Sequence, residues 1–178
     1  PCKVGISYKD KIMMLGSCFS DNIGSRLRNY GFDVSVNPFG TLYNPASILS
    51  SVRRMLSGTT FSAEDCVEIG AGDSRTCSFC HHTSFARASQ TEFIENANAR
   101  LAEASEFFQE CNKVIITLGT SWCYRHIDKG MIVSNCLKRN PKEFVREFLP
   151  ASQTTEMLRE IMELCPDKQF IFTVSPIR

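Results

Sequence analysis

Short apolar runs along the chain are predicted to be β-strands. Residues 11–15 form a run that stops at a glycine, and residues 113–118 form a nearly unbroken run rich in β-branched residues, as in strands buried on both faces. Residues 32–36 alternate apolar with polar positions, and residues 169–174 are again mostly apolar. Residues 131–133 are predicted to form a shorter strand.

Helical periodicity fills the stretches between these strands. Apolar residues recur every three or four positions through 93–111, and the stretch 44–58 opens with Asn-Pro, a capping residue followed by a proline suited to the first turn. Residues 59–90 are irregular and predict loops with short strands. Three further helices are predicted: 20–31 capped by Ser20, 141–148 opened by Pro141, and a segment capped by Ser152.

Strands that alternate with helices indicate an α/β fold with a mostly parallel sheet and helices on both faces. The length of 178 residues suits one domain, residues 1–178, with a sizeable core. The last predicted strand ends four residues before Arg178. A parallel strand is normally followed by a covering helix, so we expect the domain to be incomplete at its C-terminus.

Charge and composition exclude several classes of function. Twenty basic and 19 acidic residues give a formal net charge of +1, which offers no electrostatic reason to expect nucleic acid or an anionic membrane as the partner. No apolar run approaches the roughly 20 residues that span a bilayer. Because the first residues have no charged lead or apolar h-region, we expect no signal peptide in this sequence. Nine cysteines in a chain of this size favour reduced thiols in a cytoplasmic protein over a disulfide framework. The oligomeric state is not predicted.

Ligands of open parallel sheets bind at the carboxyl ends of the strands, which points to three segments. These segments are 16–20, 40–43 and 119–124. In the first of them, Gly16 allows a sharp turn, and the side chains that follow sit at a helix N-terminus. The N–H groups and dipole there favour an anion, lower the pKa of a thiol and stabilise a developing oxyanion. The segment is predicted to present a small nucleophilic side chain.

Five blocks of the sequence resemble the GSCFA domain family, in the family's order and over nearly the whole chain. The first block, 15–24, reads Leu-Gly-Ser-Cys-Phe-Ser-Asp-Asn-Ile-Gly and has Ser20 where the family name has Ala. The other blocks are 37–45 (Asn-Pro-Phe-Gly-Thr-Leu-Tyr-Asn-Pro), 116–122 (Ile-Thr-Leu-Gly-Thr-Ser-Trp), 135–138 (Asn-Cys-Leu-Lys) and 172–178 (Phe-Thr-Val-Ser-Pro-Ile-Arg).

The family is similar to SGNH (GDSL-like) hydrolases, and that similarity implies a three-layer α/β/α, flavodoxin-like fold. It also implies hydrolysis of an ester or transfer of its acyl group, with carbohydrate esters among the candidate substrates. By register, Cys18 falls at the nucleophile position and Ser17 falls where the superfamily has Asp. Either the thiol attacks, or the turn is reset and Ser17 attacks. No cofactor or metal is implied.

The same comparison implies a set of groups around the substrate. Gly40 matches the glycine that supplies an oxyanion N–H. The Gly-x-Asn block reads Gly119-Thr120-Ser121, so its Asn is missing. Asn135 is a candidate replacement, and the backbone N–H groups of Cys18 and Gly40, with Asn135 or Ser121, would hold the oxyanion. The superfamily's C-terminal Asp and His have no counterpart before Arg178, which leaves no evident general base. The alternative function is therefore a non-catalytic binding domain with a degenerate site.

A second motif, Cys77-Ser-Phe-Cys80-His81-His82, has the Cys-x-x-Cys-His pattern of haem attachment and of some zinc sites. No second Cys/His pair follows at suitable spacing. Two other interpretations of His81 and His82 stay open: the family resemblance implies a position at the rim of the active site, and a hydrogen-bonded structural pair is the other. Trp122 and Tyr124 are candidates for stacking on a sugar or for ordinary packing, and His126 for a surface loop.

Overall fold

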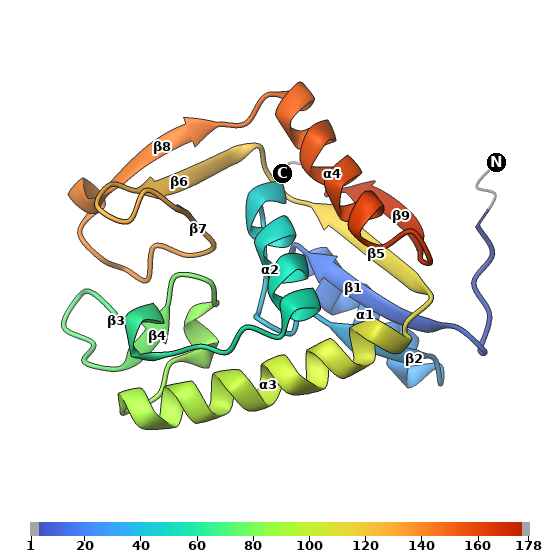
Figure 1. Cartoon of the computed structure of the whole chain (residues 1–178), viewed down its shortest axis with the longest axis horizontal. Helices are drawn as coiled ribbons and strands as arrows, with labels where there is room; N and C mark the ends of the chain where they lie inside the picture. The colour runs from blue at the N-terminus through green and yellow to red at the C-terminus, as the bar shows by residue number, and fades with distance from the viewer. Residues whose placement is uncertain (1–3, 176–178) are drawn as a thin grey trace.

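A computed structural model describes residues 4–175. Its central sheet has four parallel strands in the order β2-β1-β5-β9, which is the flavodoxin-like arrangement of an open α/β sheet (Figure 1). The bounds of the helices and longer strands are β1 (Lys11–Gly16), α1 (Cys18–Asn29), β2 (Asp33–Val36), α2 (Pro45–Ser57), α3 (Gln90–Glu110), β5 (Lys113–Leu118), α4 (Ala151–Leu164) and β9 (Gln169–Val174).

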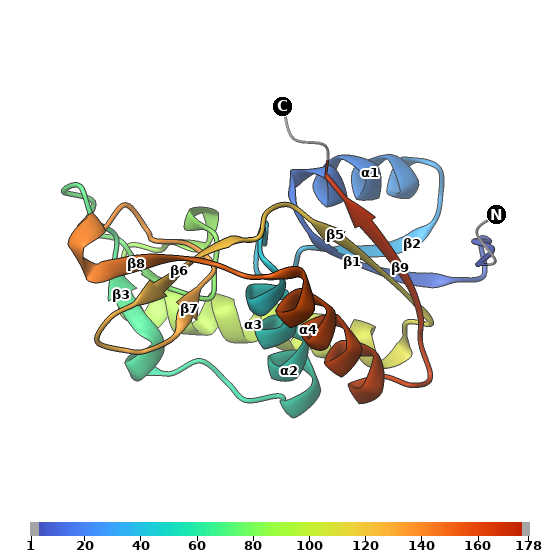
Figure 2. The same cartoon turned by 90° about the horizontal axis from the view of Figure 1, so that it is seen from above.

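The helices cover both faces of this sheet, so the predicted three-layer α/β/α fold is confirmed. Helix α1 lies on one face, and α2, α3 and α4 lie on the other (Figure 2). Alternate residues of β1 point to the two layers: Ile12 and Met14 pack toward α1, and Met13 and Leu15 belong to the larger core beneath α2 and α3. All four are fully buried, which explains why this strand is an almost continuous apolar run.

Two small antiparallel sheets lie beyond the carboxyl ends of the central strands. One is the hairpin β3 (Cys66–Glu68) and β4 (Thr76–Ser78), which forms within the irregular 59–90 region. The other has the order β7-β6-β8, with β6 (Trp122–His126), β7 (Ile132–Val133) and β8 (Phe144–Phe148) (Figure 1). The chain leaves β5 and enters β6 within four residues, so this second sheet stands directly beside the end of the central one.

The structure corrects three of the sequence predictions. Ser17, not Ser20, is the N-cap of α1, and the buried Ser20 hydroxyl instead donates to the carbonyl of Leu15. Helix α4 begins at Ala151 after Pro150 rather than with a Ser152 cap. Residues 141–148 form one 3₁₀ turn (Pro141–Glu143) followed by strand β8, not a helix.

None of the helices in the described range is both long enough and apolar enough to cross a membrane.

Candidate active site at the Gly16 turn

The turn between β1 and α1 is locked by a glycine that no other residue could replace without strain. Gly16 has φ of +135°, and a Cβ built on it would lie 2.1 Å from the carbonyl oxygen of Thr117 on β5. The Ser17 N–H donates to that same carbonyl at 3.1 Å, and the Leu42 N–H donates to the Gly16 carbonyl at 2.8 Å. The start of α1 is therefore fixed between β5 and the loop that follows β2.

The two candidate nucleophiles stand in different surroundings. Ser17 is only 2% exposed, and its hydroxyl accepts the N–H of Phe19 at 3.3 Å and lies 2.5 Å from the hydroxyl of Ser175. Cys18 is the first residue of α1 and is exposed. In the part of the chain that the structure describes, no acceptor is found for the Cys18 N–H. Ser17 therefore caps the helix from within, while the thiol of Cys18 faces solvent at the positive end of the helix dipole.

A buried amide network, which the sequence did not predict, supports the turn from the side of β2. The Oδ1 atom of Asn37 accepts the N–H of Gly16 at 2.9 Å, and its Nδ2 atom donates to one carboxylate oxygen of Asp21 at 2.7 Å. The Thr41 hydroxyl donates to the other oxygen of Asp21 at 3.0 Å. Asp21 is thereby held in the first turn of α1, where a negative charge is favourable. Asn37 adopts the left-handed conformation (φ +43°), and no local pattern in the sequence indicates this contact with Asp21.

Tyr43 connects the loop beside the Gly16 turn to the end of β5. Its carbonyl accepts the N–H groups of Gly119 at 3.0 Å and Thr120 at 2.9 Å. Partial burial raises the pKa of its phenol, and nearby negative charge on Cys18 and Asp21 raises it further. The phenol is therefore protonated at neutral pH, and the Tyr43 ring lies beside Ser17, since a Cβ built on Gly119 would be 3.0 Å from Tyr43 Cδ1 and 3.3 Å from the Ser17 Cβ.

The N–H of Gly40, predicted to contact the oxyanion, and the N–H of Gly119, another predicted site residue, both donate to protein carbonyls. The Gly40 N–H donates to the carbonyl of Asn37 at 2.8 Å, and the Gly119 N–H donates to Tyr43. Gly40 has a φ of +86°, and a Cβ there would lie 2.4 Å from the Cβ of His82, so its role in this structure is a tight turn against that histidine. The N–H of Cys18 itself has no acceptor within residues 4–175.

Two hollows open beside this turn and share Thr120. The first, which we call the aromatic hollow, has a volume of about 280 Å³ and contains the predicted Asn135. The second, the β9 hollow, has a volume of about 200 Å³ and contains Gly119 and the predicted Ser121. The aromatic hollow is lined by Tyr43, Asn44, Thr120, Trp122, Cys123, Tyr124, Val133, Ser134, Asn135 and Cys136, and the β9 hollow by Pro45, Leu118, Gly119, Thr120, Ser121, Thr154, Val174 and Ser175.

None of the three histidines hydrogen bonds to the Gly16 turn in the described residues, although His82 packs against Gly40 and its N–H donates to the carbonyl of Phe39 at 3.0 Å. His81 is fully buried against four phenylalanine rings (Phe39, Phe61, Phe85 and Phe93), and burial lowers its pKa to about 3. Its Nδ1 atom lies 2.7 Å from the Ser78 hydroxyl. His82 caps a 3₁₀ turn and contacts the Ser84 hydroxyl. His126 is only 7% exposed on β6 and packs on Phe79 and Phe144, so the prediction of a surface loop was wrong for this residue.

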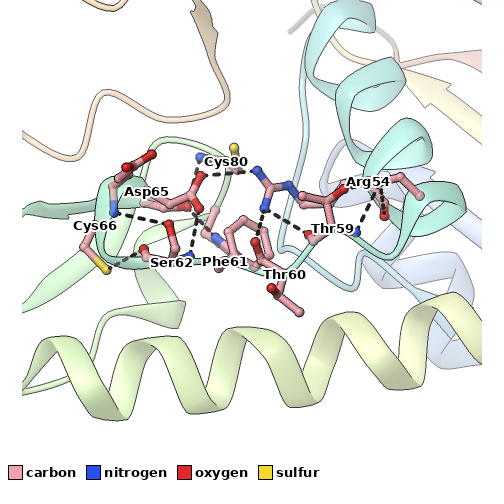
Figure 3. Close-up of polar contacts among 12 residues, drawn as sticks. Arg54, Thr59, Thr60, Phe61, Ser62, Asp65, Cys66 and Cys80 are labelled. Atoms are coloured by element: carbon pink, nitrogen blue, oxygen red, sulfur yellow. Dashed lines mark hydrogen bonds and ion pairs between the residues drawn. The ribbon is translucent and has the colours of Figure 1, made fainter.

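The Cys-x-x-Cys-His motif is part of the core. Cys77 is buried, which raises the pKa of its thiol to about 11, and its Sγ atom faces the carbonyl of His82. Burial also raises the pKa of Cys80, which lies beside the ion pair of Arg54 and Asp65 (Figure 3). Within residues 4–175, no three His, Cys, Asp or Glu side chains are grouped so as to hold a metal ion. All eight cysteines in that range are free, and Cys2 lies outside it.

The loop around this motif is anchored by one arginine. Arg54, near the end of α2, donates to the carbonyls of Thr59 and Thr60, and its guanidinium lies 3.9 Å from the centre of the Phe61 ring (Figure 3). The segment 59–65 before the motif is therefore held by Arg54, while within the motif His81 contacts the Ser78 hydroxyl and its buried Nε2 atom has no partner among residues 4–175.

Comparison with known proteins gives one match. No curated protein and no solved structure matches the chain. The model of the GSCFA family matches residues 11–178, a range that includes the Gly16 turn, the Asn37 loop and the end of β5. The chain belongs to the GSCFA family.

Proposed function

We propose that this domain carries out acyl chemistry on an ester, by hydrolysis or by transfer to an acceptor hydroxyl, with Cys18 as the nucleophile. The observation that carries the proposal is the contrast between neighbours: the Cys18 thiol is exposed at the first residue of α1, whereas the Ser17 hydroxyl is buried and engaged. SGNH-type chemistry, implied by the family resemblance, is consistent with a nucleophile at this turn.

The local electrostatics favour attack by the thiolate. The helix N-terminus stabilises negative charge on sulfur and then on the carbonyl oxygen of the substrate. The sulfur attacks the carbonyl carbon, and the π electrons move to the oxygen, where the free N–H of Cys18 donates to it. Collapse of this adduct expels the alkoxide, which takes up a proton, and leaves a thioester on Cys18. Water or an acceptor hydroxyl then attacks the thioester and releases the thiolate.

Among residues 4–175, no histidine forms a hydrogen bond with Cys18: the rings of the three histidines instead contact Ser78, Ser84 and Glu143. Both carboxylate oxygens of Asp21 accept hydrogen bonds from Asn37 and Thr41. In this proposal the thiolate relies on the helix N-terminus for its stability.

The test is turnover of p-nitrophenyl acetate together with labelling by a thiol-directed activity probe. Cys18→Ala should abolish labelling and reduce turnover by more than about 10³-fold, because it removes the attacking atom. Ser17→Ala should keep labelling, and Cys66→Ala serves as the matched control at a half-buried cysteine remote from the turn. Full activity in Cys18→Ala combined with loss in Ser17→Ala would assign the reaction to serine instead.

The second candidate function is a non-catalytic binding domain on the same scaffold. It is favoured by the N–H groups of Gly40 and Gly119, which both donate to protein carbonyls. Under this alternative, the chain binds a ligand in its hollows with the same affinity in wild type and Cys18→Ala, and neither protein turns over an ester.

A further inference from the structure

The aromatic hollow has the composition of a carbohydrate subsite next to the proposed nucleophile. We infer that it binds a pyranose ring that carries an acidic group, stacked on Trp122 and Tyr124 with its acid directed to Arg146. This inference names the substrate class of the proposed site and so rests on the proposed function.

The rings are held in place by the antiparallel pairing of β6 and β8. Trp122 pairs with Phe148 and Tyr124 pairs with Arg146, so these four side chains share one face of the sheet. The Phe148 ring meets the Trp122 ring edge-on at 5.2 Å, and the Arg146 guanidinium lies 4.0 Å from the Trp122 ring centre. Trp122 nevertheless remains 44% exposed and Tyr124 42% exposed. The Trp122 ring is thus fixed by its neighbours, which lowers the entropic cost of stacking, and both rings are open to a ligand.

The polar groups of the aromatic hollow are uncharged. The Oδ1 atom of Asn135 accepts the N–H of Leu137 at 2.8 Å, and no acceptor for its NH₂ group is found among residues 4–175. Thr120 accepts the N–H of Trp122 at 3.0 Å through its hydroxyl oxygen, which leaves the hydroxyl hydrogen free to donate. Amide and hydroxyl donors beside aromatic faces match a polyol ring, whose C–H face is apolar and whose rim is made of hydroxyl groups. A volume of about 280 Å³ suits one small ring.

The positive charge of Arg146, beside the Trp122 and Tyr124 rings, favours an acidic ligand. Arg146 has no carboxylate within ion-pair distance in the described part of the chain, whereas its neighbours Arg125 and Glu147 neutralise each other at 2.8 Å. The net charge beside the aromatic platform is therefore that of one guanidinium. A guanidinium pairs with a carboxylate through two parallel hydrogen bonds, which a neutral sugar cannot offer.

The position of Tyr43 connects this subsite to the reaction. Tyr43 lines the aromatic hollow, and its ring lies beside Ser17, because a Cβ built on Gly119 would be 3.0 Å from Tyr43 Cδ1 and 3.3 Å from the Ser17 Cβ. A ring in the aromatic hollow would thus lie next to the turn that carries Cys18.

The experiment uses Trp122 as its own reporter, since it is the only tryptophan of the chain. Fluorescence of Cys18→Ala is titrated with trigalacturonic acid, with cellotriose as an uncharged trisaccharide and with benzoate as a planar acid. We expect saturable quenching by trigalacturonate, at least tenfold weaker affinity for cellotriose, and weaker trigalacturonate binding at high salt.

Variants test each part of the subsite. Arg146→Gln should lower the affinity for trigalacturonate to that for cellotriose. Tyr124→Ala should weaken the binding of both trisaccharides about tenfold. Tyr124→Phe keeps the aromatic ring and should bind as the wild type does. This result would show that Tyr124→Ala acts by removing the ring and not by disrupting the sheet. Tyr30→Ala removes an exposed tyrosine from the C-terminal end of α1 and should change nothing.

Equal affinity for the two trisaccharides, or quenching by benzoate without quenching by either sugar, would overturn the inference. Saturable trigalacturonate binding that depends on Arg146 supports it even where no ester is turned over, in which case the proposed function fails and the subsite stands. Labelling and turnover at Cys18 without any sugar binding would leave the proposed function intact and refute the subsite.

Discussion

Asn37 donates its side-chain amide to the carboxylate of Asp21 at 2.7 Å while its carbonyl oxygen accepts the N–H of Gly16. One side chain from the loop after β2 thereby holds both the last residue of β1 and the first turn of α1. The turn that presents Cys18 is built by contacts between segments distant in sequence, and its stability should depend on them.

Replacing Asn37 tests this dependence. Asn37→Ala leaves the buried N–H of Gly16 without an acceptor, and we expect a loss of about 2–3 kcal/mol in the free energy of unfolding, measured by urea denaturation. Asn22→Ala is the control, because Asn22 donates only to the carbonyl of Cys18 on the exposed surface of α1 and should cost less than about 0.5 kcal/mol. Equal losses in the two variants would refute the central position of Asn37.

Gly16 and Gly58 both have a positive φ, but replacing each with alanine should lower the free energy of unfolding by very different amounts. Gly58→Ala meets open space and should cost only about 1 kcal/mol for the left-handed backbone. Gly16→Ala adds a backbone clash at 2.1 Å from Thr117 and should cost about 3 kcal/mol or more. Thermal or urea unfolding of the two variants compares them directly, and similar losses would show that the clash relaxes.

His81 should make the protein less stable in acid. Its folded-state pKa of about 3 lies below the unfolded value of about 6.5, so between these values the unfolded chain binds the extra proton. Stability contributed by neutral His81 is complete above pH 6.5 and is lost as pH falls toward 3, at up to about 1.4 kcal/mol per pH unit. His81→Phe should flatten that part of the stability profile, as measured by urea unfolding at several pH values. An unchanged slope would place the acid sensitivity in the carboxylates.

Alkylation by iodoacetamide should rank the cysteines. Among the eight in the described range, Cys18 is the exposed one and should react first in the native protein. Cys77 and Cys111 are buried, with thiol pKa values raised to about 11 by burial, and should react only after unfolding. Mass spectrometry of proteolytic peptides reads out the order. Early modification of Cys77 would show that the core around His81 opens readily.

The sequence was most informative where a single periodicity applied. Strands β1 and β5 are buried on both faces and therefore read as unbroken apolar runs, while α2 carried its own start and stop in Asn44 and Gly58. Strand β8 was taken for a helix because Pro141 suits a first helical turn; that proline opens a 3₁₀ turn instead, and the strand after it forms by pairing with β6.

The candidate site could be predicted only in outline. The local sequence predicts the Gly16 turn, because a glycine between an apolar strand and a helix is typical of a tight connection. Asn37 and Asp21 contact each other across 16 residues of sequence, and Tyr43 acts through its backbone carbonyl. No local sequence pattern predicts either kind of contact. The helix cap was misplaced at Ser20 because Ser17 and Ser20 are equally good capping residues, and the tertiary position of the turn decides between them.

Thr120 lines both hollows, and its N–H is fixed to the carbonyl of Tyr43. The aromatic hollow and the β9 hollow thus have one short lining residue in common. A larger residue at position 120 would reduce the volume of both hollows, so a change confined to one hollow has to be made at a residue that lines it alone, such as Tyr124 in the aromatic hollow or Thr154 in the β9 hollow.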